Sequence, residues 1–311
     1  MGKANETVKA ERRRIVEEAL ELMQGGRLDW ANELCGTVVP CNYVTGRRYN
    51  GGNVLHLGCA MRRNGWSDPR FLTFAQAKAN GLKVRKGERG SIVEHWKLVR
   101  FSGGDEADDA TESEDPARIR PVLVGYWRVF NVEQCDGEIK PITEVVHSDD
   151  DLIEQSARIE AASPCPVNVL MTDVACYMPM RDRIEIYPRE AARSVNGWTR
   201  VLLHEMTHAT GHPSRLDRDI VNRFGSPDYA REELVAELGA AFLSAEIGLP
   251  AQSATEFGES EHARQHAAYL QSWIAALEDD PDELFRAASK ASAAADYLGS
   301  LIDPEGARDA A

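Results

Sequence analysis

The sequence predicts an α+β protein built from two domains, and three observations support this prediction. The chain has 311 residues, which exceeds the usual length of one domain. Some segments have apolar residues at helical spacing, and others have the short apolar runs of strands. The charge is divided, because residues 40–100 carry 12 Lys and Arg against 3 Asp and Glu, whereas residues 151–311 carry 14 against 27. We therefore expect one domain over residues 1–145 and a second over residues 146–311.

Two helices are expected in the first half from their caps and apolar spacing. Residues 6–24 have the pattern of an amphipathic helix, which the glycine pair after them would end. Residues 71–81 predict a shorter helix with Thr73 as N-cap and a glycine at its end. Between these helices, residues 40–54 are rich in turn formers, and their paired glycines would let a ligand approach the backbone closely.

Two strands are expected in the remainder of this half. They cover residues 92–96 and 122–130, and a basic turn over residues 83–91 leads into the first. The stretch 102–117 lacks apolar content, so we expect a mobile acidic loop there. The domain boundary is expected near residues 140–152, where a Lys-Pro pair and a Ser-Asp-Asp-Asp run precede a new helix.

The second half predicts strands followed by helices. Residues 167–171 and 175–188 indicate strands, with a turn at Arg181 and Asp182. Residues 269–301 indicate two helices that separate at an Asp-Pro pair.

The most specific motif of the chain is His-Glu-Met-Thr-His at residues 204–208. On a helix, residues four apart share a face, so His204 and His208 can bind one metal ion. Glu205 is then placed to take a proton from a metal-bound water. The alternative is a solvated helix with two histidines, which the apolar residues around the motif disfavour. The strand before this helix could pair along its edge with an extended peptide.

The third ligand is expected on a helix that begins after Ser226 and ends at Gly248. Glu233 and Glu237 lie four residues apart on one face, as in the E-x-x-x-D/E arrangement of zincins. In that arrangement Glu233 binds the metal and Glu237 orients a ligand histidine. Glu232 is a competing ligand that helical register does not exclude.

Two histidines, one glutamate and an open position for water are typical of a catalytic zinc site. We expect one Zn²⁺ per chain, with Mn²⁺ or Co²⁺ as substitutes. His212 follows the helix end at a spacing that differs from the metzincin pattern, so we interpret it as a rim residue or a cap. His212 and Tyr229 are the two further candidates for stabilising an oxyanion.

A basic segment in the first half indicates nucleic-acid binding. Its cations lie in glycine-flanked turns, where they can neutralise phosphates, and aromatic residues are interleaved with them. The expected DNA-binding residues are Arg47, Arg48, Tyr49, Lys83, Arg85, Lys86 and Arg89. Further possible stacking residues are Tyr43, Trp66, Phe71 and Trp96, most of which we expect to pack in the core instead.

The composition narrows the class of protein. The chain has no run of 18 apolar residues and no apolar signal core at its N-terminus, so we expect no membrane association. Its six cysteines form no C-x-x-C pair, and reduced thiols are the simplest interpretation. These features predict a cytoplasmic protein.

Two sets of motifs, in order along the chain, resemble one known family. The N-terminal set resembles the ArdC-type antirestriction proteins, whose first domain also occurs in TraC-type conjugation primases. The C-terminal set resembles the zincin-like metallopeptidase domain that follows it. The resemblance covers roughly residues 10–300, and the acidic stretch 103–117 departs from it. The matching segments are residues 40–53, 73–78, 86–90, 129–131, 203–218 and 232–242.

The resemblance implies a domain that binds single-stranded DNA, a zincin-like domain, and a role in protecting incoming DNA from restriction. A protein or peptide substrate is the other partner to consider, with a component of a restriction system as the candidate. Two alternatives stay open: a cytoplasmic metallopeptidase with a basic regulatory domain, and a DNA-binding protein whose metal centre is not catalytic. The intact Glu205 favours a catalytic centre, because a structural metal site needs no general base.

Overall fold

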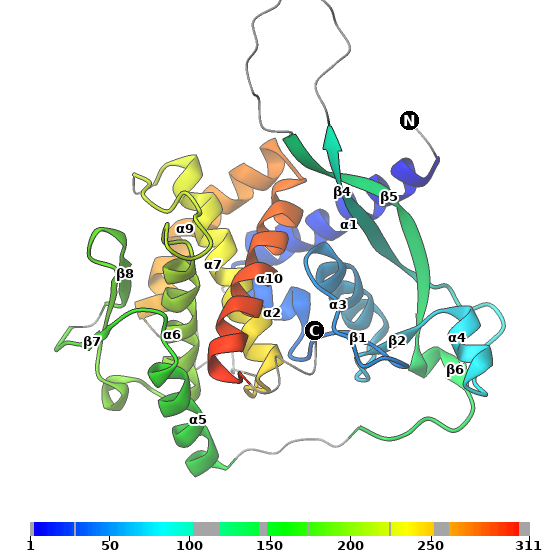
Figure 1. Ribbon diagram of the computed structural model, residues 1–311, viewed down its shortest axis with the longest axis horizontal. Helices are drawn as coiled ribbons and strands as arrows, with labels where there is room; N and C mark the ends of the chain where they lie inside the picture. The colour runs from blue at the N-terminus through cyan, green and yellow to red at the C-terminus, as the bar shows by residue number, and fades with distance from the viewer. Residues whose placement is uncertain are drawn as a thin grey trace, which may run out of the picture.

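The computed structural model describes residues 3–27, 29–101, 118–142, 148–172, 174–223, 225–251 and 261–304. Helices fill the centre, with a long ribbon of two strands on one side and a small sheet on the other (Figure 1). This arrangement confirms the predicted α+β class. The acidic stretch 102–117 lies outside the described residues, and so does part of the expected boundary near 140–152. In the described ranges, no helix combines the length and apolar character needed to cross a bilayer.

The first half contains helices that pack on a mixed sheet with the strand order β1-β2-β5-β4. β1 runs parallel to β2, and the other neighbouring pairs are antiparallel. The helices are α1 (Lys3–Gln24), α2 (Trp30–Cys35), α3 (Gly52–Asn64) and α4 (Phe74–Ala79). The strands of this sheet are β1 (Cys41–Asn42), β2 (Arg70–Leu72), β4 (Ser91–Phe101) and β5 (Arg118–Asn131), while β3 (Lys83–Val84) pairs with β6 (Cys135–Asp136).

Two of the expected helices are present, and one of them is shorter than expected. α1 confirms the helix expected over residues 6–24. Thr73 caps α4 and forms a reciprocal capping box with Gln76. Phe71 and Leu72 fall within the range expected for this helix but belong to β2, where they pair with β5 and are fully buried in two different core clusters.

α3 was not predicted from the sequence, where residues 40–54 indicated only turns. It begins at Gly52 and buries a continuous run of residues. A Cβ at Gly58 would lie 2.6 Å from the carbonyl oxygen of Cys35, so this glycine lets α3 approach α2 closely. The close packing of the two helices gives the reason for a glycine inside a helix, where it is otherwise unfavourable.

The second half begins with α5 (Asp149–Ala161), capped by Ser148. A three-stranded sheet follows, with the order β7-β9-β8. Its strands are β7 (Val167–Val169), β8 (Cys176–Met178) and β9 (Arg183–Ile186), which confirm the strands expected in this region. The helices that follow are α6 (Val195–Thr210), α7 (Pro227–Glu246), α9 (Glu261–Asp279) and α10 (Glu283–Ile302). The break between α9 and α10 lies at the Asp-Pro pair, as expected.

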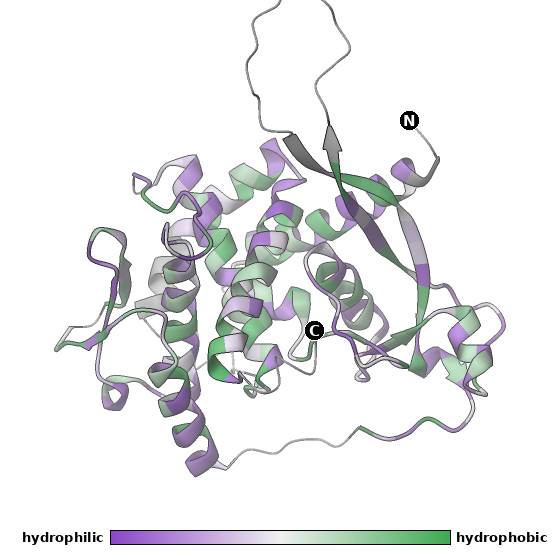
Figure 2. Ribbon diagram, viewed as in Figure 1, coloured by the Kyte–Doolittle hydropathy of each residue, from purple (hydrophilic) through white to green (hydrophobic). Residues whose placement is uncertain are grey.

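One hydrophobic core joins helices from both sides of residue 145. It contains buried residues of α1, α2 and α3 together with those of α6, α7, α9 and α10. At its centre the rings of Trp30 and Trp273 meet edge to face, with their centroids 5.9 Å apart. The hydrophobic residues of these central helices, and those of β4 and β5, are coloured green in Figure 2.

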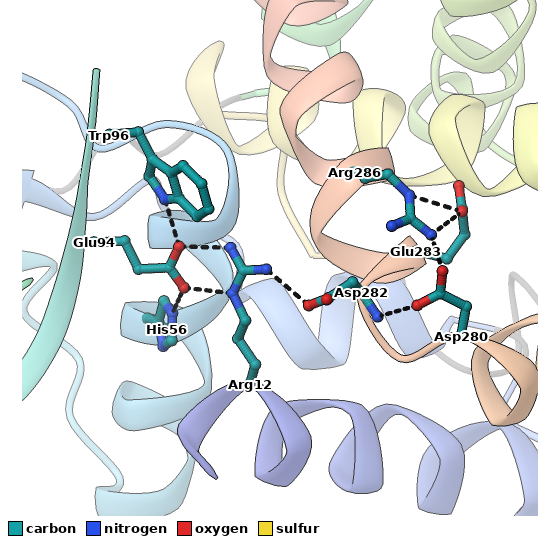
Figure 3. Close-up of polar contacts among 8 residues, drawn as sticks. All are labelled: Arg12, His56, Glu94, Trp96, Asp280, Asp282, Glu283 and Arg286. Atoms are coloured by element: carbon teal, nitrogen blue, oxygen red, sulfur yellow. Dashed lines mark hydrogen bonds and ion pairs between the residues drawn. The ribbon is translucent and has the colours of Figure 1, made fainter. Parts of the chain in front are cut away.

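A buried carboxylate also connects the ribbon to the helices (Figure 3). Both oxygens of Glu94 on β4 accept hydrogen bonds from Arg12 of α1, at 2.7 and 2.6 Å. Glu94 also bonds the Nε2 atom of His56 on α3 at 2.8 Å and the Nε1 atom of Trp96 at 2.6 Å. Arg12 reaches Asp282, before α10, at 2.8 Å. Burial alone would raise the pKa of Glu94, but the hydrogen bonds from Arg12 and His56 lower it to about 2.

Candidate functional site

The histidine motif lies on a helix, α6, as expected. The side chain of Ser194 accepts a hydrogen bond from the backbone of Gly197 and caps the helix, which ends at Gly211. Almost every residue of α6 is buried, because the helix packs between α5, α7 and the small sheet. The motif therefore sits on a helix that the core holds in place.

α7 lies against α6 and supplies the carboxylates. Ser226 caps it and Pro227 occupies its first turn, as predicted. A Cβ at Gly239 would lie 2.6 Å from the Cγ2 atom of Thr207, so the absence of a side chain there lets α7 approach α6. This contact brings the glutamates of α7 next to the histidines of α6.

The structure brings together the three predicted ligands. Nε2 of His204 lies 3.5 Å from one oxygen of Glu233, and Nε2 of His208 lies 3.5 Å from the other. One ligand atom from each residue can be chosen so that all three lie within 4.8 Å of one another. The two imidazole rings are 4.9 Å apart and nearly perpendicular.

The other nitrogen of each histidine faces a second carboxylate. Nδ1 of His204 lies 3.7 Å from Glu237, and Nδ1 of His208 lies 3.3 Å from Glu232. The sequence left open whether Glu232 or Glu233 is the third ligand, and the two side chains lie in different positions. Glu233 faces both Nε2 atoms, whereas Glu232 faces the back of His208.

Arg218 holds Glu232 and was missed by sequence reasoning. Its guanidinium contacts both carboxylate oxygens of Glu232, at 3.1 and 2.7 Å. It also donates to the Thr210 hydroxyl at 2.7 Å and to the Thr207 carbonyl at 2.8 Å, so it is anchored to the end of α6. In the sequence, this role of Arg218 could have been inferred only from its position shortly after the helix that carries the motif.

Glu205 contacts the small sheet. One of its oxygens accepts a 2.7 Å hydrogen bond from the backbone nitrogen of Tyr177 in β8. β8 lies at an edge of the sheet, whereas β9, the strand immediately before α6, lies in its centre. The expectation that the strand before the helix offers a free edge is therefore wrong, because β9 is paired on both sides.

Electrostatics in this cluster favour charged groups despite the burial. Burial lowers the pKa of His204, but hydrogen bonds to Glu233 and Glu237 raise it well above its ordinary value. For His208, burial also lowers the pKa, and the charge of Glu233 with the bond to Glu232 brings it up to about 9. Burial raises the pKa of Glu233, but the charge of His208 and hydrogen bonds from both histidines hold it well below its usual range. The buried carboxylates thus create a site that attracts positive charge.

The two candidate oxyanion stabilisers lie in different surroundings. The Tyr229 hydroxyl lies 3.0 Å from that of Tyr269, and burial and the charge of Glu233 raise the pKa of Tyr229. His212 lies past the end of α6, where its ring contacts the Ser214 hydroxyl at 2.8 Å. Tyr229 is the candidate that the structure places beside the ligand cluster.

The predicted DNA-binding cations are all exposed, but two are engaged within the protein. Arg48 forms an ion pair with Glu246 of α7. Arg85 pairs with Glu88 at 3.1 Å and bonds nearby backbone carbonyls. The other four predicted DNA-binding cations, all exposed, are Arg47, Lys83, Lys86 and Arg89.

The predicted aromatic residues are mostly buried or half-buried, as expected. Phe71 is fully buried, while Tyr49 and Trp66 pack against the core cluster that contains it. Trp96 is 41% exposed, and two aromatic residues with greater exposure, Phe74 and Trp127, were missed; each is 62% exposed. Sequence reasoning missed them because exposure depends on neighbours that are distant in the chain.

Comparison with known proteins gives two family matches in chain order. Residues 9–130 match the N-terminal domain of the anti-restriction factor ArdC, and residues 154–290 match a zincin-like metallopeptidase domain. The resemblance inferred from the motifs is thereby confirmed.

Relatives and solved structures extend these matches over most of the chain. Two DNA primases TraC of Escherichia coli are 35% identical over 91% of this chain, which spans only 26% and 19% of their length. The uncharacterised protein y4eC of Sinorhizobium fredii is 32% identical over 92% of this chain and 90% of its own.

The antirestriction protein ArdC of the R388 plasmid has a similar structure in its metal-free form, with a TM-score of 0.70, 29% identity, and 94% and 98% of the two chains covered. Its Mn(II)-bound form gives a TM-score of 0.67 and 30% identity, and 94% and 97% of the chains are covered. The protein therefore belongs to the ArdC family of antirestriction proteins.

Proposed function

We propose that this protein protects incoming mobile-element DNA from host restriction, binding single-stranded DNA and carrying a metal-dependent peptidase centre. The convergence of His204, His208 and Glu233 is the observation that carries the peptidase part. The match of residues 9–130 to the ArdC N-terminal domain and the exposed cations of that region support the DNA-binding part.

The donor set fits a divalent metal ion. Two imidazole nitrogens and one carboxylate oxygen suit zinc, and the same donors accept manganese or cobalt. The ArdC relative has been solved with Mn(II). We propose His204, His208 and Glu233 as the ligands, with Zn²⁺ as the first candidate. Glu237 and Glu232 would fix the orientation of the histidine rings through their Nδ1 atoms.

The chemistry proposed for the centre is peptide-bond hydrolysis. A bound divalent ion would supply a Lewis acid that polarises the peptide carbonyl. Glu205 would accept a proton from the attacking water and pass it to the leaving amine. The Tyr177 amide fixes one oxygen of Glu205, which leaves the other oxygen for the proton. The hydroxyl of Tyr229, whose pKa is raised by burial and by the charge of Glu233, would donate to the developing oxyanion.

The peptidase proposal can be tested on the full chain with Glu205→Gln. The metal-free protein is titrated with Zn²⁺ or Mn²⁺ and assayed on unfolded protein substrates. We expect one ion per chain in the wild type and in Glu205→Gln, with hydrolysis absent from the variant because an amide accepts no proton. Glu190→Gln, at an exposed carboxylate of the same half, should behave as the wild type. Hydrolysis that survives in Glu205→Gln would refute the assignment, and His204→Ala should bind no stoichiometric metal.

The DNA proposal predicts preference for single strands and sensitivity to salt. Affinity for labelled single-stranded and duplex oligonucleotides is measured by fluorescence anisotropy over a range of salt concentrations. Combined substitution of Arg47 and Lys86 by alanine should weaken binding to all sequences and reduce the salt slope, since each lost phosphate contact removes released counterions. Equal affinity for both forms of DNA, or binding that ignores salt, would contradict this proposal.

A further inference from the structure

The β4–β5 ribbon carries a large aromatic residue that is mostly exposed. Trp127 of β5 is 62% exposed, although tryptophan is usually among the more buried residues. Within the described ranges, its indole makes no hydrogen bond and no ring contact. Val122 and Val124 of the same strand are also exposed, at 37% and 53%. Exposed apolar groups gathered in this way commonly mark a surface that binds a partner.

The strand register places open space and a cation beside this indole. Trp127 pairs with Val93, His95 pairs with Gly125, and Lys97 pairs with Val122. The register shifts between His95 and Trp96, where β5 has one extra residue. β4 has no extra residue there, so its side chains keep alternating, and His95 and Lys97 share the face of Val93 and hence of Trp127. A Cβ built on Gly125 meets nothing within 4 Å, so the position between Trp127 and His95 is open. The indole, the imidazole and the ammonium group thus border one open patch.

The charge of the ribbon suits a polyanion. The two strands contain five Lys and Arg but a single acidic residue, Glu94. That carboxylate is buried and paired with Arg12, so it does not repel phosphate at the surface. At its base the ribbon joins the turn that holds Lys86 and Arg89, because Arg128 donates to the carbonyl of Gly90 at 3.1 Å. A strand of nucleic acid could therefore pass from this turn onto the ribbon.

The polar network in Figure 3 fixes the ribbon at Glu94. Glu94 pairs with Tyr126, the neighbour of Trp127, and its side chain is held by Arg12 and His56. The side chain of Asn53 bonds both the nitrogen and the carbonyl oxygen of Glu94, at 2.7 and 3.1 Å. This part of the ribbon is thus anchored to α1 and α3, and a surface fixed before binding loses less entropy when the ligand arrives.

We propose that the face of the ribbon with Trp127, His95 and Lys97 stacks bases and contacts phosphates of single-stranded DNA. This inference rests on the proposed DNA-binding function and assigns it to a surface other than the turns at residues 47 and 86. Single strands are favoured because their base faces are exposed, whereas a duplex hides them. Trp127 supplies the stacking surface and Lys97 the cation.

The test uses the full chain and a fluorescein-labelled oligodeoxythymidine of roughly 15 nucleotides, a length within the range of such sites. Trp127→Ala should lower the affinity by about 5- to 150-fold, as expected for the loss of one stacked base. Trp127→Phe, which keeps an aromatic face, should restore most of the affinity. Leu98→Ala is the matched control, because Leu98 is 76% exposed on the opposite face of the same ribbon and should leave binding unchanged.

The salt dependence of binding distinguishes base stacking by Trp127 from phosphate contact by Lys97. Trp127→Ala should keep the wild-type slope of affinity against salt, because stacking releases no counterions. Lys97→Gln should reduce that slope by about 0.7, the amount expected for one phosphate contact on a single strand.

The inference is overturned if the wild type binds the oligonucleotide and Trp127→Ala binds it equally well, a result that leaves the proposed function intact. It is also overturned if Trp127→Ala converts a dimer into a monomer in sedimentation, which would make a second copy the partner. Failure of the wild type to bind single strands at low salt would refute the proposed function together with this inference.

Discussion

Substitution of Glu94 by glutamine should remove a pH-dependent part of the stability. The pKa of Glu94 is lowered from 4.5 to about 2 in the folded chain. Each unit of difference corresponds to about 1.4 kcal/mol, so the ionised carboxylate stabilises the fold by about 3 kcal/mol at neutral pH. Its side chain is only 3% exposed, so solvent screens the interaction little. Because the folded pKa is depressed, the stabilisation is complete above pH 4.5 and is lost as the pH falls towards 2.

The assay is urea unfolding of wild type and Glu94→Gln, followed by tryptophan fluorescence at several pH values with EDTA present. The variant should be less stable by about 3 kcal/mol at neutral pH. The difference should shrink as the pH is lowered through 4.5, where the wild type begins to lose the same contribution. Glu17→Gln, at an exposed position of α1, is the control and should cost almost nothing. A difference that stays constant with pH, or one no larger than that of the control, would refute the electrostatic origin.

The remaining predictions concern the metal centre. Gly239→Ala should destabilise the chain by about 1–3 kcal/mol in thermal unfolding, because the new Cβ meets the Thr207 methyl at 2.6 Å. Adding Thr207→Ser to this variant removes that methyl and should restore much of the lost stability. If the double variant recovers no stability, the clash is contradicted. Arg218→Met should weaken metal binding by about 10- to 100-fold in a titration, because Glu232 loses its partner; unchanged affinity would contradict its positioning role. Tyr229→Phe should bind metal normally but hydrolyse peptides more slowly, whereas wild-type rates would remove Tyr229 from the mechanism.

Features that depend on neighbours in sequence were predicted well. The helix of residues 6–24, α7 with its cap at Ser226, and the break between α9 and α10 follow from apolar spacing and capping residues. Such features are local, because helical hydrogen bonds and caps join residues within one or two turns. α3 was missed because its first residues belong to a segment rich in turn formers, and the glycine inside it, Gly58, is explained only by contact with Cys35 on another helix.

The sequence by itself indicated the candidate residues of the metal centre, since the spacing of His204, Glu205 and His208 places them on one side of a single helix. It also indicated the helix that bears the facing glutamates. Only the tertiary structure decided that Glu233 faces both Nε2 atoms while Glu232 is held by Arg218. Those positions depend on how closely two helices pack, and helical register alone does not specify that distance.

The same distinction applies to the surface. The sequence showed that the first half is basic, but it did not show that Arg48 is paired with Glu246, 198 residues away. Nor did it show that Trp127 is exposed while Phe71 is buried. Composition fixes the charge and the number of aromatic rings that a chain carries. Which of them remain available to a ligand is decided by long-range contacts, because burial and ion pairing depend on segments that meet only in the folded chain.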